Sequence, residues 1–156
     1  MEQQTAVILA HGLWHQPAHF DRQAGALQAQ GVTVHAPRLH RGSLADDTAA
    51  VQEIVDACRV PPVVLGHSYG GSVITGLERA GHFVYIAAFV LAPGESGAEL
   101  GGPDALVNKA VQENDNGTTS IRLGMARELL YADCTEEDSA WASALLVQQR
   151  PGHGGW

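Results

Sequence analysis

The chain has 156 residues, which suffices for one domain with a hydrophobic core and is too short for two ordinary domains. Hydrophobic residues make up 45% of it, as in a folded globular protein rather than a disordered one. Its formal net charge of −8, with no local cluster of Lys or Arg, argues against nucleic acid as a partner.

Neither the N-terminus nor the cysteines indicate export or a metal site. Residues 1–5 have no basic start, and the apolar run 6–10 is too short for a signal sequence or a membrane span. Cys58 and Cys134 lie far apart without zinc-ligand spacing, so we expect two buried thiols. We therefore expect a cytoplasmic protein with no metal site and no membrane contact.

Four apolar runs of strand length alternate with three helical patterns. The runs are residues 5–10, 32–36, 62–66 and 82–88. The first helical pattern runs from Pro17 to Leu27. The second begins at a capping box formed by Ser43 and Asp46, and the third covers residues 69–80. Strands alternating with helices predict an α/β fold, with a parallel sheet that has helices on both faces.

The pattern changes after Phe89. Residues 93–116 are rich in Gly, Pro, Asp and Glu, as in a long loop. A short strand at 118–123 and two helices follow, one around 126–131 and one that begins at Thr135. We therefore divide the chain into an α/β core (residues 1–92), a mostly helical lid (residues 93–149) and a tail (residues 150–156).

Residues 66–70 read Gly-His-Ser-Tyr-Gly, a G-x-S-x-G motif. An apolar strand runs directly into it and a helix leaves it, as a nucleophile elbow requires. Glycine on both sides of Ser68 removes the side chains that would collide in so tight a turn. This context predicts that Ser68 is a catalytic nucleophile.

Acyl transfer also needs backbone N–H groups that face the developing oxyanion. One would come from Tyr69, the residue after the nucleophile. The other would come from the loop after the first strand, where His11-Gly12 is followed by Leu13. We expect the Leu13 amide to be that donor and His11 to be structural.

Several stretches together are similar to one branch of the α/β-hydrolase superfamily. They are Leu9-Ala-His-Gly-Leu-Trp-His15, Leu65-Gly-His-Ser-Tyr-Gly-Gly71, Tyr85-Ile-Ala-Ala-Phe89 with Pro93-Gly-Glu-Ser96, and Leu130-Tyr-Ala-Asp-Cys-Thr135. The branch contains methyl-salicylate and methyl-ketone esterases and hydroxynitrile lyases, and the resemblance covers about residues 7–149. It implies a serine hydrolase that needs no cofactor, with Ser68 as nucleophile and Leu13 and Tyr69 at the oxyanion hole.

The resemblance also implies an aspartate and a histidine in loops after two further strands beyond the lid. The sequence after the lid is only residues 150–156, so we expect an α/β-hydrolase core that is incomplete at its C-terminus. Glu95, which follows the fourth strand, and His153, in the tail, are the two candidates to replace them. A serine without a base is a weak nucleophile, so the enzyme would then have very low activity.

Three functions remain open. The first is a carboxylic-ester hydrolase that acts on small apolar esters through an acyl-enzyme. The second is a non-catalytic protein that binds a small apolar ligand. The third is a lyase like the hydroxynitrile lyases, which the resemblance disfavours because those enzymes carry threonine where this chain has Gly12.

The fourth strand is apolar on both faces, which is unusual for the edge of a sheet. If no further strand covers it, its unpaired backbone groups and apolar side chains are a template for association. We therefore expect self-association, or a partner chain, at this open edge.

Overall fold

The structure is a computed structural model that describes residues 5–150. Its main sheet has four parallel strands in the order β2-β1-β3-β4. The strands are β1 (Ala6–Ala10), β2 (Thr33–His35), β3 (Val63–His67) and β4 (His82–Ile86). The predicted fold class is confirmed, and each strand lies within one residue of its predicted run except at the end of β4.

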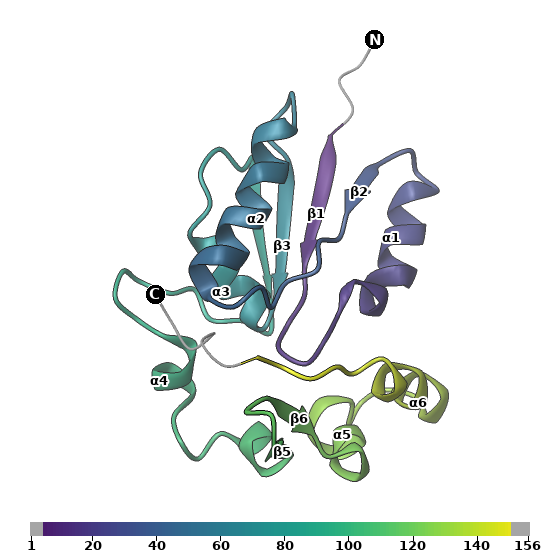
Figure 1. Ribbon diagram of the computed structural model, residues 1–156. Coiled ribbons are helices and arrows are strands. Elements are labelled where there is room, and N and C mark those ends of the chain that lie inside the picture. The colour runs from purple at the N-terminus through teal and green to yellow at the C-terminus, as the bar shows by residue number, and fades with distance from the viewer. Residues whose placement is uncertain (1–4, 151–156) are drawn as a thin grey trace.

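Helices lie on both faces of the sheet (Figure 1). The first pattern forms a short 3-10 helix, η1 (Pro17–Phe20), followed by α1 (Asp21–Gln28) on one face. On the other face α2 (Leu44–Ala57) packs beside α3 (Tyr69–Thr75). The capping serine of α2 is confirmed, because its Oγ accepts a hydrogen bond from the Asp46 N–H at 3.0 Å. Helix α3 ends before residue 80, because Gly76 caps it and Arg79 then turns the chain at a φ of 63°.

The main core lies between the sheet and the α2–α3 pair. Its strand residues are Ile8, Ala10 and Val64, and its helix residues include Val51, Val55, Val73 and Ile74. These side chains are fully or almost fully buried, and burying one such aliphatic side chain stabilises a fold by about 1.5–3 kcal/mol. The core therefore fixes the direction in which the chain passes from β3 to α3.

Residues 97–144 form a second group of elements across the carboxyl ends of the strands (Figure 1). They are α4 (Gly97–Gly101), η2 (Leu106–Lys109), β5 (Val111–Glu113), β6 (Thr119–Ile121), α5 (Leu123–Leu130) and α6 (Glu136–Ala144). All of them except α4 contribute to a separate small core around Ala110, Ile121, Ala126, Tyr131 and Ala142. Strand β6 lies within the short strand predicted at 118–123, whereas α4, η2 and its antiparallel partner β5 fall where the composition predicted a loop.

The expectation of two buried thiols is wrong. Cys134 is exposed in the turn between α5 and α6, and Cys58 is only half-buried at the end of α2. Leu44, Val51, Val55 and Cys58 follow one another at helical spacing and form an apolar stripe, but Cys58 is the residue at which α2 already ends. Both cysteines are free.

Strand β4 is the most exposed part of the sheet. Phe83, Val84 and Ile86 are 42%, 38% and 46% exposed. In the described part of the chain β4 pairs only with β3, so it forms an edge of the sheet. None of the helices within residues 5–150 has the length and apolar character needed to cross a bilayer.

The approach of α3 to β1 gives a test of the fold. A Cβ on Gly70 would lie 2.1 Å from the Ala10 carbonyl oxygen, which is backbone and has no room to move. We expect Gly70→Ala to lower the free energy of unfolding by about 3 kcal/mol or more, measured by urea denaturation.

The matched control is Gly25→Ala in α1, where a Cβ would meet nothing within 4 Å. Alanine is the better helix former, so this change should stabilise the protein by about 0.5–1 kcal/mol. Equal effects of the two substitutions would contradict the close packing of α3 on β1.

Candidate active site

Ser68 lies at the junction between β3 and α3, as predicted. Its φ of 52° and ψ of −120° are strained for a residue other than glycine. The Ser68 N–H donates to the Ile86 carbonyl of β4 at 3.1 Å, and the Ser68 carbonyl accepts from the Gly71 N–H at 2.9 Å. The predicted elbow geometry is therefore confirmed.

The glycines of the motif permit the close approach that the elbow needs. A Cβ on Gly66 would lie 2.5 Å from the backbone of Gly70 and Gly71. A Cβ on Gly12 would lie 3.1 Å from Ser68 Cβ and 3.2 Å from His67 Nδ1. The loop after β1 and the elbow after β3 thus touch, which brings Leu13 and Ser68 to the same place.

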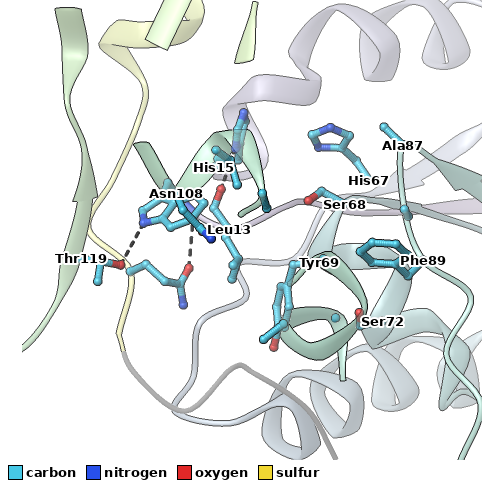
Figure 2. A pocket seen from close by; sticks show the side chains of 18 of the residues that line it. Leu13, His15, His67, Ser68, Tyr69, Ser72, Ala87, Phe89, Asn108 and Thr119 are labelled. Carbon is cyan, nitrogen blue, oxygen red and sulfur yellow. Dashed lines mark hydrogen bonds between the residues drawn. The ribbon is translucent and has the colours of Figure 1, made fainter. Parts of the chain in front are cut away.

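A cavity of about 1330 Å³ opens between the elbow and residues 97–150. Its lining includes Leu13, Ser68 and Tyr69, together with apolar side chains such as Phe89, Leu91 and Val107. Figure 2 shows the Ser68 hydroxyl on the side of the residue that faces Leu13. Within residues 5–150 the Ser68 Oγ has no hydrogen-bond partner, so it is available to a ligand.

Backbone strain is concentrated at this cavity. Within the described residues five non-glycine residues have a positive φ, and three of them, Trp14, Ser68 and Ala87, line the cavity. Such conformations cost about 1–3 kcal/mol each and persist only where surrounding contacts hold them. Strain of this kind is typical of a functional site.

The loop that carries Leu13 is held by residues from the far end of the chain. Trp14 donates from Nε1 to Thr119 Oγ1 at 3.0 Å, and its carbonyl accepts from the Val147 N–H at 2.8 Å. The Trp14 N–H also donates to Gln149 Oε1 at 3.4 Å. The Leu13 N–H has no acceptor within residues 5–150, so it can donate to a bound ligand.

His15 is buried and bonded at both ring nitrogens. Nδ1 donates to the Leu13 carbonyl at 2.7 Å, and Nε2 accepts from the Tyr131 hydroxyl at 2.9 Å. Burial lowers the pKa of His15 to about 3, so the ring is neutral near pH 7. His15 thus lies in the loop after β1, as a histidine between two elements is expected to, but it is buried rather than on the surface.

His67, beside the nucleophile, also lines the cavity. Its ring lies 5.5 Å from that of His15, between ring centroids, and burial lowers its pKa as well. No hydrogen bond within the described residues joins either histidine to the Ser68 hydroxyl. The two rings give the site polar but uncharged walls.

The two candidate substitutes for the missing acid and base do not meet Ser68 in the described residues. Glu95 is absent from the cavity lining, and its carboxylate accepts a hydrogen bond from the Ala92 N–H at 2.7 Å. His153 lies outside the described residues. No group of three or more His, Cys, Asp or Glu within residues 5–150 is arranged to hold a metal ion.

Asp47 contacts the site through Tyr69 and was not predicted from the sequence. It is fully buried in α2 and accepts a hydrogen bond from the Tyr69 hydroxyl at 2.7 Å. Burial and this bond raise the pKa of Tyr69, so the phenol stays protonated. A signal was present, because Asp47 follows Leu44 by three residues on the apolar stripe of α2, where a carboxylate is unusual.

The model of the alpha/beta hydrolase family matches residues 7–156. A pyrethroid hydrolase from Sphingobium wenxiniae is 30% identical over 106 residues, which are 58% of this chain and 38% of that protein. The match therefore spans well under half the length of this relative.

Solved structures show the same fold over nearly the whole chain. A pyrethroid hydrolase from Sphingobium faniae JZ-2 is 25% identical with a TM-score of 0.76, covering 94% of this chain and 68% of that one. Tomato methylketone synthase I complexed with 2-tridecanone has a TM-score of 0.81 at 16% identity, over 96% of this chain and 69% of that one. At that identity the likeness is one of fold alone.

The buried histidines make stability depend on pH. Burial lowers the pKa of His11 to about 4 and that of His15 to about 3, from an ordinary value of 6.5. Between pH 6 and pH 4 the unfolded chain binds protons that the folded chain does not. Acidification should therefore lower the free energy of unfolding by at most about 1.4 kcal/mol per pH unit for each histidine.

Urea denaturation at several pH values measures this slope. His11→Asn removes one of the two groups, so its slope should be smaller by the amount due to one proton. Equal slopes for the wild type and His11→Asn would contradict the neutral state of His11.

Proposed function

The chain belongs to the alpha/beta hydrolase family, and on that premise we propose that it is a carboxylic-ester hydrolase with Ser68 as nucleophile. The observation that supports this most is the strained Ser68, whose hydroxyl lines a large cavity without a hydrogen-bond partner in the described residues. Two relatives at 30% and 25% identity are named as hydrolases, which supports hydrolysis as the reaction.

The proposed reaction has two steps. Ser68 Oγ bonds to the ester carbonyl carbon while a base removes its proton, and the alcohol leaves with a proton to give an acyl-enzyme. Water then releases the acid and frees Ser68. In both steps the Leu13 and Tyr69 amides donate to the carbonyl oxygen, where negative charge develops.

The proposed substrate is a small, uncharged, apolar ester. The cavity holds about 1330 Å³ and is lined mainly by apolar side chains, while His15 and His67 are neutral because burial lowers each pKa. A charged substrate would lose its hydration against these apolar side chains and neutral rings. In this proposal residues 93–149 form the lid of the cavity.

The proposed location of the protein is the cytoplasm.

The proposal requires a general base that residues 5–150 do not bring to Ser68. One candidate for this base is His153, and the other is a residue outside this sequence. Glu95 remains the candidate within the chain for the acid that would orient such a histidine.

A second function is supported by the same lack of a base in the described residues. A large apolar cavity with an unactivated serine suits a protein that binds a small apolar ligand without converting it. The experiment on Ser68 below separates the two functions.

We expect the chain of 156 residues to hydrolyse 4-nitrophenyl butyrate slowly and without a burst of acylation. Oxyanion stabilisation and binding alone leave on the order of 10³–10⁴ over the reaction in water in proteases that lack a triad member. Imidazole added as an external base should raise the rate, and Ser68→Ala should abolish both the basal rate and the rescue. The release of 4-nitrophenol measures each rate.

The matched control is Ser139→Ala, which removes a buried hydroxyl without a hydrogen-bond partner from α6, away from the cavity. It should keep both rates. Rescue that survives Ser68→Ala would refute the nucleophile, and loss of the basal rate in His153→Ala would identify the base.

The exposed β4 edge supports a further part of the proposal, association with a second copy of the chain. Apolar side chains on both faces of β4 lie beside backbone groups that no strand pairs within residues 5–150. Two such edges related by a two-fold axis can pair with each other and bury Phe83, Val84 and Ile86.

Sedimentation velocity at several concentrations tests this association. We expect the wild type to sediment as a dimer or larger species and Phe83→Lys to shift it towards the monomer, because a charge would be buried in the contact. Leu123→Lys is the control, since Leu123 is 65% exposed at the start of α5, away from β4. A monomer across the concentration range, with no binding of a hydrophobic dye, would refute the contact.

A further inference from the structure

The carbonyl oxygen of Gly12 accepts from three donors. His11 Nδ1 lies 2.9 Å from it, His40 Nε2 lies 3.2 Å from it, and the His15 N–H lies 3.3 Å from it. A carbonyl oxygen can only accept a hydrogen bond. His11 must therefore carry a proton on Nδ1, and His40 must carry one on Nε2. A turn after a strand does not need two imidazoles that donate to one peptide oxygen.

The other nitrogen of His11 fixes the state of that ring. The Leu39 N–H donates to His11 Nε2 at 3.0 Å, so Nε2 carries no proton. Burial lowers the pKa of His11 to about 4, which keeps the ring in this one neutral tautomer near pH 7. The rings of His11 and His40 meet edge to face, with 4.8 Å between centroids.

The Gly12 carbonyl belongs to the same peptide as the Leu13 N–H. That peptide is trans, so its C=O and N–H point in opposite directions. Donors that fix the oxygen on one side therefore fix the direction of the N–H on the other. Hydrogen bonds to the oxygen also polarise the peptide, which strengthens the N–H as a donor by about 10–30% per bond.

Asp47 connects this peptide to Tyr69. Its carboxylate accepts from the backbone N–H groups of His40 and Arg41, both at 3.0 Å, and from the Tyr69 hydroxyl at 2.7 Å. His40 has a φ of 70°, which a residue other than glycine adopts only when its surroundings hold it. The buried carboxylate of Asp47 thus holds two groups in place. They are the turn that carries His40 and the ring of Tyr69, the residue after Ser68.

We infer that Asp47, His40 and His11 are positioning residues for the oxyanion hole, because they set the direction and donor strength of the Leu13 N–H. Asp47 in addition links that amide to Tyr69, the source of the second donor. The inference rests on the proposed function, since it assigns these residues a part in the same reaction.

The test combines turnover with carbonyl chemical shifts in Asp47→Asn and His40→Asn. Asparagine tolerates a positive φ, so His40→Asn removes the imidazole without straining the turn, and it tests the inference even if Asp47→Asn does not fold. We expect the ¹³C resonance of the Gly12 carbonyl to move upfield in each variant. Ser68-dependent hydrolysis of 4-nitrophenyl butyrate, with imidazole present, should lose at least about tenfold in kcat while KM stays within about twofold.

Asp46→Asn is the matched control, because it removes the same charge from the neighbouring, exposed position of α2. It should leave kcat, KM and the Gly12 resonance unchanged. A folded Asp47→Asn or His40→Asn variant with unchanged kcat, or with an unmoved Gly12 resonance, would overturn the inference. Hydrolysis that does not depend on Ser68 would instead refute the proposed function.

Discussion

The arrangement of the site depends on two peptide backbones that pass each other without side chains between them. Gly70, at the start of α3, lies against the end of β1, and Gly66 lies against the first turn of α3. Any Cβ at these positions would separate the elbow from the loop that follows β1. The contact therefore allows Ser68 and Leu13, which are 55 residues apart in the sequence, to line one cavity.

Burial governs the electrostatics of the site. His11, His15 and His67 are neutral because burial lowers their pKa values, and each of the first two is held as one tautomer by bonds at both nitrogens. Neutral rings can direct hydrogen bonds at backbone carbonyls without placing a positive charge beside an apolar ligand. Histidines serve here as fixed donors and acceptors rather than as titrating groups.

The sequence predicted the sheet and the elbow well, because apolar runs, capping residues and G-x-S-x-G are local signals. It predicted β6 but not its partner β5, which has only three residues and lies in a segment with the composition of a loop. It also missed the burial of His15 and the links of Asp47, because each bond joins residues that are far apart in the chain. Tyr131, for example, reaches His15 across 116 residues.

The hydrogen bonds of Trp14 and His15 tie the loop after β1 to residues 119–147, so that the two segments cannot move independently. Val147, Thr119 and Tyr131 all bond to these two residues, and Gln16 donates to the Leu145 carbonyl at 2.7 Å. Lifting residues 119–147 away would break these bonds and release the strained backbone of Trp14. A substitution on either side of this contact therefore needs an accommodating change on the other side if these hydrogen bonds are to be kept.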